Sequence, residues 1–184
     1  MIIHPLNEFD GKGWFRGGLR NPLVPVSLIV MHSTAGSSLA GAVSTLRSKG
    51  FGYHYLIEKS GKVWKCAPIS RKLGHAGNSY GPREQAKGVS RRQSHGGNFD
   101  AGCSVNGYSI GISFVHENNG VTKITGAQMD SAISLVREIH AAMPKIAFVT
   151  THAIVSPGRK SDPKPFDLDA FAASVGLHAW RYTG

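Results

Sequence analysis

Apolar side chains gather in short runs along the chain, and these runs predict the strands of a sheet. Residues 26–31 (VSLIVM), 109–115 (SIGISFV) and 146–150 (IAFVT) are short, apolar and rich in branched side chains, which is typical of buried strands. Two further runs, 53–58 and 62–66, flank a Ser-Gly pair and predict a hairpin.

Other segments carry the signals of helices. In residues 126–142 the apolar side chains recur at helical spacing, Thr125 is a candidate N-cap, and Pro144 follows the end. Residues 37–48, which begin beside two serines and stop before a glycine, and residues 167–175 predict two shorter helices. This mixture predicts an α/β fold in which a central mixed sheet is flanked by helices.

The length of the chain, 184 residues, is within the usual size of one domain. We expect a single domain over residues 1–184, with its core over residues 25–176. Residues 1–24 are rich in Gly, Asn and Pro and are expected to wrap the surface. Residues 74–108 show little periodicity and predict a long loop, which is unusual in a compact domain and suggests function or disorder.

Composition and charge narrow the class of partner. Hydrophobic residues make up 41% and charged residues 17%, which is enough apolar side chain for one core. Lys and Arg number 21 against 11 Asp and Glu, so the net charge is +10 and polyanionic partners are favoured. Nucleic acid, anionic membranes and bacterial envelopes all qualify. Because the basic residues are not interleaved with aromatic ones, we expect no nucleic-acid partner.

Three features concern the compartment. No apolar stretch approaches the ~18 residues of a membrane span, so we expect no stable membrane insertion. The first residues do not place a basic region before an apolar run, so we expect synthesis in the cytoplasm without a secretory signal. Cys66 and Cys103 belong to no C-x-x-C motif and are expected to be free thiols.

Two histidines follow apolar strands closely enough to form a site. His32 comes after VSLIVM, His152 after IAFVTT, and Asp162 lies in the loop that follows His152. Catalytic zinc sites offer three protein ligands, among them imidazole nitrogen and carboxylate oxygen. The spacing alone leaves an alternative, in which both histidines bond to backbone and Asp162 is a turn residue before Pro163.

Lys160 stands two residues before Asp162. In extended chain two such residues face the same way, so a cation and a metal ligand would share one site. A cation placed there would stabilise the oxyanion of an acyl-transfer reaction. The alternative is a solvated surface lysine.

Five segments, taken together, resemble one known family. They are IVMHSTAG (29–36), GYHYLIEKSGKVWK (52–65), GHAG (74–77), NGYSIGISF (106–114) and THAIVSPGRKSDPKPFD (151–167). Their order and content resemble the zinc-dependent N-acetylmuramoyl-L-alanine amidases of type 2. That family includes T7-type phage lysozymes, cytosolic muropeptide-recycling amidases and peptidoglycan recognition proteins. The resemblance implies their fold, and a zinc ion held by His32, His152 and Asp162.

The resemblance also implies roles for three more side chains. Lys160 would polarise the scissile carbonyl, Tyr53 would lie near the attacking water, and His75 would touch substrate. The alternatives are a packing role for Tyr53 and a backbone-bonded loop histidine at position 75. Asp162 matches the recycling enzymes, since the lysozyme-type members have Cys there.

One position departs from the recycling enzymes, which have a general-base Glu where this chain has Ser113. A serine without a partner base is a poor proton acceptor, so Tyr53 is expected to orient the water instead. His116 and Glu117 are weaker candidates. His54 is expected to point to the other face of the sheet and to pack in the core.

The implied reaction is zinc-dependent hydrolysis of the amide bond between N-acetylmuramic acid and L-alanine in peptidoglycan. A phage or prophage endolysin, a cytosolic recycling amidase and a non-catalytic peptidoglycan-binding module are the alternatives. The basic charge, Tyr53 and Ser113 favour the endolysin, which would act on the wall after release; a monomer is expected. Arg83, Lys87, Arg91 and Arg92 would contact acidic wall polymers or lie in a solvated loop.

Overall fold

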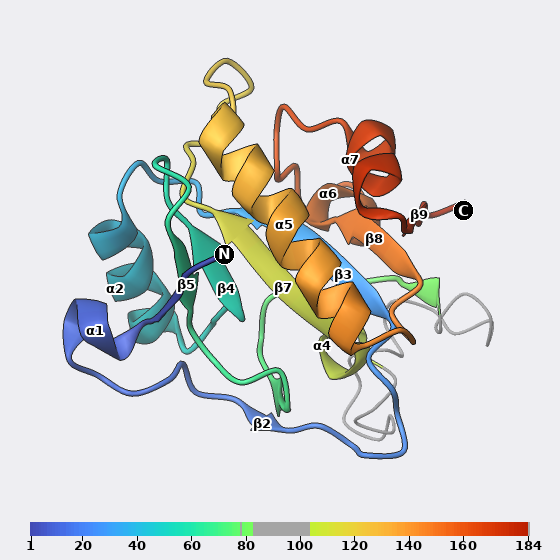
Figure 1. Ribbon diagram of the computed structural model, residues 1–184, viewed down its shortest axis with the longest axis horizontal. Helices are drawn as coiled ribbons and strands as arrows, with labels where there is room; N and C mark the ends of the chain where they lie inside the picture. Colours follow the sequence, from blue (N-terminus) through green and yellow to red (C-terminus); the bar gives the residue numbers. More distant parts are fainter. Residues whose placement is uncertain (78, 83–103, 184) are drawn as a thin grey trace.

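A seven-stranded sheet separates two layers of helices (Figure 1). The computed structural model describes residues 1–77, 79–82 and 104–183. The strands lie in the order β1-β5-β4-β7-β3-β8-β9, and among them β4 and β5 form the one antiparallel pair of the described sheet. Their bounds are β1 Ile3–Pro5, β3 Leu28–Ser33, β4 Tyr55–Ile57, β5 Val63–Lys65, β7 Ser109–Phe114, β8 Phe148–Thr151 and β9 His178–Ala179. The predicted mixed central sheet is confirmed.

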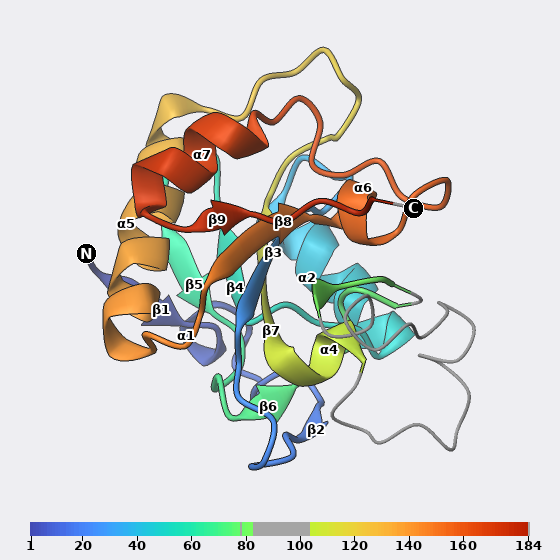
Figure 2. The same cartoon turned by 90° about the vertical axis from the view of Figure 1, so that its right-hand side faces the viewer.

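Helices cover both faces of this sheet. Figure 2 shows α5 (Gly126–Ala142) and α7 (Leu168–Val175) on one side and α2 (Leu39–Lys49) on the other. One-turn helices add α1 Asn7–Asp10, α4 Val105–Tyr108 and α6 His152–Val155, and β2 Gly18–Leu19 pairs with β6 Arg71–Lys72 outside the main sheet.

The long helices begin where the sequence predicts a cap. The Ser38 side chain accepts from the Gly41 amide at the start of α2, and Thr125 and Gln128 form a reciprocal capping box at the start of α5. Gly50 ends α2 with a positive φ of 67°, a conformation that glycine adopts without steric cost.

Side chains of the central strands alternate between the two faces. Along β3, Ile29 and Met31 join the core under α5 and α7, whereas Leu28 and Val30 pack on the opposite side. The strand begins and ends two residues later than the predicted run, so it includes His32. His32 lies two residues after Val30, on the same face of the strand as Leu28 and Val30, so it faces away from α5.

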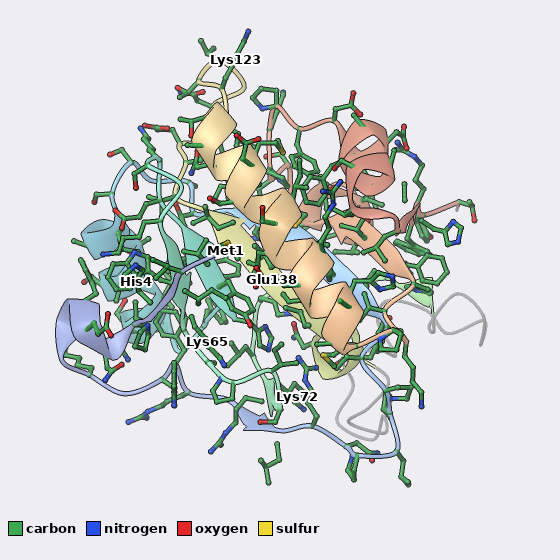
Figure 3. The ribbon with its side chains drawn as sticks, viewed as in Figure 1. Met1, His4, Lys65, Lys72, Lys123 and Glu138 are labelled. Atoms are coloured by element: carbon green, nitrogen blue, oxygen red, sulfur yellow. The ribbon has the colours of Figure 1, made fainter. Side chains whose placement is uncertain are left out.

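The N-terminal segment contributes to the sheet rather than only covering it. β1 pairs in parallel with β5, and Leu6, Phe15 and Val24 are buried. Figure 3 shows Met1 beside Glu138 of α5, and the terminal ammonium lies 3.4 Å from that carboxylate. The surface-wrapping segment that the sequence predicts thus includes an edge strand, because three residues of strand carry too little pattern to be recognised.

Arg20 ties this segment to the start of β7. Its guanidinium donates to the carbonyls of Ile69 at 2.6 Å, Gly107 at 2.8 Å and Ser109 at 2.6 Å. Burial lowers the pKa of Arg20 to about 10, which still leaves it charged at neutral pH.

Two expectations about the rest of the chain can be compared with the structure. In the described part of the chain, the helices are all too short or too polar to cross a bilayer. The thiol of Cys66 is free and buried, and burial raises its pKa; Cys103 lies outside the described residues.

Candidate functional site

The side chains of His32, His152 and Asp162 converge at one edge of the sheet. His32 lies near the end of β3, and His152 begins α6 directly after β8. Because β3 and β8 are adjacent and parallel, their carboxyl ends meet at the same edge. One ligand atom from each of the three residues lies within 4.8 Å of the other two. All three residues are buried, with exposed fractions of 0%, 4% and 8%.

Each of the three side chains is held by a specific contact. The carboxylate of Asp162 accepts from the Ser33 amide at 3.3 Å. His152 Nε2 lies 3.1 Å from the carbonyl oxygen of Ala76, which can only accept, so this nitrogen carries a proton. His152 Nδ1 then faces the Asp162 carboxylate at 3.1 Å. On the other side of that carboxylate, His32 Nδ1 lies at 3.4 Å.

The donor set fits a divalent zinc ion. Zinc takes imidazole nitrogen and carboxylate oxygen, and a catalytic site needs three such ligands with one open position. Within the described residues, His32 Nδ1 is buried and makes no hydrogen bond, although it points toward the carboxylate. A buried nitrogen of this kind is costly unless something satisfies it, and a shared cation would do so.

The charge states of the cluster agree with this fit. Burial, and next the nearby His152, lower the pKa of His32 to about 4, so its imidazole is neutral at pH 7. Burial alone would raise the pKa of Asp162, but the close contacts of its carboxylate with the His152 and His32 imidazoles outweigh burial and lower the pKa below its usual range. Neutral imidazole and ionised carboxylate are the forms that bind a metal.

A cleft of about 220 Å³ opens over the cluster, and His152 lines it together with Tyr53 and Lys160. Lys160 is exposed and lines this cleft. The structure therefore brings both predicted catalytic side chains to the same cleft as His152.

The ring of Tyr53 lies beside His32 of the His-His-Asp cluster. Its ring centroid lies 4.8 Å from that of His32, and its hydroxyl bonds to Ser113, which pairs with His32 in the register of β3 and β7. Burial, followed by the charge of Asp162, raises the pKa of Tyr53, so the hydroxyl stays protonated at neutral pH.

His75 is buried behind His32 rather than freely exposed to the cleft. Its Nδ1 lies 3.1 Å from His32 Nε2, and its Nε2 lies 3.1 Å from Ser109 Oγ. Burial, with His32 as the next cause, lowers the pKa of His75 well below its usual value. Although part of His75 lines the cleft, its contact with substrate stays a prediction.

Strand β7 supplies two partners of the site, Ser109 and Gly111, that the sequence analysis missed. Its side chains alternate between Ser109, Gly111 and Ser113 on the face of the site and large apolar residues on the other face. A Cβ at Gly111 would come within 2.7 Å of His75 Cγ, so only glycine leaves room for the imidazole. The alternation of small and large residues in SIGISF is the signal that could have located this space.

The expectation that His54 points to the other face of the sheet is wrong, although the residue is buried as expected. Its ring packs beside His75, with ring centroids 5.9 Å apart, and its Nδ1 accepts from the Gly111 amide at 3.0 Å. The prediction assumed that Tyr53 and His54 alternate as in a strand, but β4 begins only at Tyr55. Both side chains can therefore reach the same side of the sheet.

Other residues named from the sequence are engaged elsewhere or lie outside the described residues. His116 bonds the Thr122 carbonyl at 2.8 Å, and Glu117 pairs with Lys59 at 2.5 Å. Arg159, which the sequence analysis did not single out, lines the cleft and donates to the Ala76 carbonyl at 2.8 Å. The four basic residues of the long loop, Arg83, Lys87, Arg91 and Arg92, fall in the part of the chain that is not described.

Fold and site define an α/β protein with a His-His-Asp cluster beneath a cleft at the carboxyl edge of its sheet. The family model of N-acetylmuramoyl-L-alanine amidase (Amidase_2) matches residues 22–165. The chain therefore belongs to this amidase family, which confirms the resemblance seen in its motifs.

Individual relatives agree with this assignment. The chain is 31% identical over 131 residues to 1,6-anhydro-N-acetylmuramyl-L-alanine amidase AmpD of Salmonella typhimurium, covering 70% of this chain and 59% of that protein. It is 29% identical over 172 residues to N-acetylmuramoyl-L-alanine amidase AmiD of Escherichia coli, covering 84% of this chain and 55% of that protein. The chain thus spans little more than half the length of these relatives.

Solved structures share the fold. N-acetylmuramoyl-L-alanine amidase LysC from Clostridium intestinale superposes with a TM-score of 0.67 at 20% identity, covering 97% of this chain and 99% of that one. Drosophila peptidoglycan recognition protein SD superposes with a TM-score of 0.59 at 20% identity, covering 89% of each chain. At such identities the likeness concerns the fold alone.

Proposed function

We propose that this protein hydrolyses the amide bond between N-acetylmuramic acid and L-alanine in peptidoglycan, using a zinc ion held by His32, His152 and Asp162. The observation that carries the proposal is the convergence of these three side chains within 4.8 Å beneath an open cleft. Membership of the amidase family supports the choice of bond.

Zinc bound there would supply a Lewis acid that polarises the scissile carbonyl and lowers the pKa of a water. The protein's own groups do the rest. The ammonium of Lys160, at the rim of the cleft, stabilises the negative charge that develops on the carbonyl oxygen. Because it stays protonated, the Tyr53 hydroxyl acts through hydrogen bonds and orients the attacking water, with Ser113 fixing its direction.

The shape of the cleft suits a chain-like substrate. Leu46 and Phe51 line both this cleft and a neighbouring depression that includes Arg16. Because Arg16 is exposed, its charge would attract the carboxylates of a stem peptide that extends from the cleft into this depression. We therefore propose that peptidoglycan binds along both the cleft and the neighbouring depression. We also propose that the protein acts as a monomer with one domain.

Two biological settings use the same chemistry. The net charge of +10, together with Tyr53 and Ser113, favours an endolysin that attacks the anionic wall. Asp162 and the sequence relation to AmpD favour a cytosolic recycling amidase. We propose the endolysin as the first candidate and the recycling enzyme as the second.

The reaction is tested by digesting purified sacculi and analysing the products by mass spectrometry, with and without a chelator. The proposal predicts free stem peptides that begin with L-alanine, and their disappearance when the metal is removed. An active enzyme that is indifferent to the chelator, or one that cuts another bond, would contradict it.

The setting is tested by comparing intact sacculi with soluble muropeptides as substrates at equal bond concentration. An endolysin should have the higher kcat/KM on sacculi, whereas a recycling amidase should prefer the soluble fragments. A protein that binds both without turnover would instead be a binding module.

A further inference from the structure

We propose that His75 is a positioning residue, which holds His32 in the tautomer whose Nδ1 is free to bind a metal, and that Ser109 in turn fixes the tautomer of His75. The inference rests on the metal centre proposed above, and it assigns a function to two buried residues that do not themselves ligate the metal. It is distinct from the contact between His75 and substrate that the motifs imply.

At one end of this chain of contacts, the direction of the hydrogen bond is fixed. The Val105 carbonyl can only accept, so Ser109 Oγ, 2.5 Å away, donates its single proton there. Ser109 Oγ must then act as the acceptor toward His75 Nε2, at 3.1 Å. His75 Nε2 therefore carries the ring proton.

A neutral imidazole with its proton on Nε2 has a bare Nδ1. That atom of His75 lies 3.1 Å from His32 Nε2 and can only accept from it. His32 Nε2 is thus protonated and His32 Nδ1 is bare. This is the nitrogen that faces Asp162 at 3.4 Å and makes no hydrogen bond among the described residues.

The structure holds the His75 ring firmly enough for this role. The ring lies against the bare backbone of Gly111, where a Cβ would approach within 2.7 Å of His75 Cγ. The backbone amide of His75 donates to Asn106 Oδ1 at 3.2 Å, and only 7% of the residue is exposed.

Comparison with the second histidine ligand explains why a serine is needed. His152 Nε2 donates to the Ala76 carbonyl, and because a carbonyl oxygen can only accept, this contact alone fixes the tautomer of His152. His32 instead meets a histidine, which could donate or accept. Because Ser109 donates to the Val105 carbonyl, it accepts from His75 Nε2, and His75 Nδ1 is left to accept from His32.

The test uses four variants of the full chain: His75→Leu, His75→Gln, Ser109→Ala and, as a control, His178→Leu on the exposed edge of β9. Two quantities are measured. Competition with a chelator gives the zinc dissociation constant, and imidazole ¹⁵N chemical shifts of the metal-free protein give the tautomer of His32.

We expect the wild-type, metal-free protein to carry the His32 proton on Nε2. His75→Leu should weaken zinc binding by roughly 10- to 100-fold, the range found when such partners are removed. His75→Gln should recover most of the affinity, because its amide can accept from His32 and donate to Ser109. Ser109→Ala should lie between, and His178→Leu should match the wild type.

Three results would overturn the proposal: a His32 proton on Nδ1 in the metal-free wild type, zinc binding by His75→Leu within twofold of the wild type, or an equal loss in the Leu and Gln variants. If His75→Leu does not fold, the wild-type tautomer and the Ser109→Ala affinity still decide. A protein that binds zinc as expected but releases no L-alanine amino termini would keep this inference and lose the proposed amidase activity.

Discussion

The two faces of the same strands differ sharply in what they present. Toward α5, strands β3 and β7 present a continuous apolar surface made of Ile29, Met31, Ile110, Ile112 and Phe114. One residue further along each strand, the opposite face presents His32, Ser109, Gly111 and Ser113. Since side chains alternate along a strand, one segment of sequence serves both purposes.

This difference shows where the fold has room for chemistry. Close-packed interiors leave few voids, so a large residue facing the site from β7 would exclude other groups. Small residues at Ser109, Gly111 and Ser113 leave a volume that the rings of Tyr53, His54 and His75 occupy. Stability comes chiefly from one face and function from the other, and four predictions test that division.

The largest effect is expected for Lys160→Met on the functional face. Removing the cation that faces the developing charge should lower kcat by about 10²- to 10³-fold. The thermal midpoint and the zinc content should not change, because Lys160 is exposed. Steady-state kinetics on a soluble muropeptide measure the loss, and Lys164→Met, at an exposed lysine of the same loop, is the matched control.

On the structural face, Ile112→Ala should lower the free energy of unfolding by about 3 kcal/mol, because it leaves a cavity under α5. Its neighbour Ser113→Ala, on the other face, should lower it by less than about 1 kcal/mol. Urea unfolding of both proteins gives the difference. If zinc affinity falls in Ile112→Ala but not in Ser113→Ala, the claim that one face serves stability and the other serves function is contradicted.

The functional face should make the fold sensitive to acid. Burial, followed by the nearby Arg20, lowers the pKa of His54 from its ordinary value of 6.5 to about 3. As the pH falls, His54 is therefore protonated in the unfolded chain before it is protonated in the folded protein. Its contribution to the free energy of unfolding is complete above about pH 6.5 and is lost as the pH falls toward 3. At about pH 5 the loss from His54 is about 2 kcal/mol.

His54→Gln should remove that part of the pH dependence. The change in unfolding free energy between about pH 7 and pH 5 should be smaller than in the wild type, whatever the stability at pH 7. His178→Gln, at an exposed histidine, should leave the pH dependence as it is. An unchanged slope in His54→Gln would show that folding does not lower the pKa of His54.

The smallest effect is expected for Tyr53→Phe. One hydrogen bond to an ordered water is worth about 1 kcal/mol, so kcat should fall by about fivefold while KM changes little. The ring contact with His32 is retained, and the fold should be unaffected. A loss as large as that of Lys160→Met would mean that Tyr53 transfers a proton rather than orients water.

Elements and contacts that depend on local sequence signals could be predicted from the sequence. Helix α5 was predicted to the residue, because the helical spacing is bounded by the N-cap Thr125 before it and Pro144 after it. The convergence of His32, His152 and Asp162 was also predictable, because each histidine lies at the carboxyl end of an apolar run and the motif supplies the carboxylate.

Contacts that depend on long-range pairing were not predictable in this way. β1 is a strand only because β5 lies beside it, 60 residues away in register, as in the pair Ile3 and Val63. The link from His32 through His75 to Ser109 joins three segments, and no local pattern encodes it. His54 was misplaced because the chain is not yet a strand at that position.

The central claim is that the polar face holds one metal ion between His32, His152 and Asp162. Zinc-edge X-ray absorption on the purified protein tests it most directly. The account predicts one zinc per chain, with imidazole nitrogens at about 2.0 Å, and loss of this signal in Asp162→Asn. A wild-type protein that takes up no zinc, or an Asp162→Asn protein with an unchanged spectrum, would contradict it.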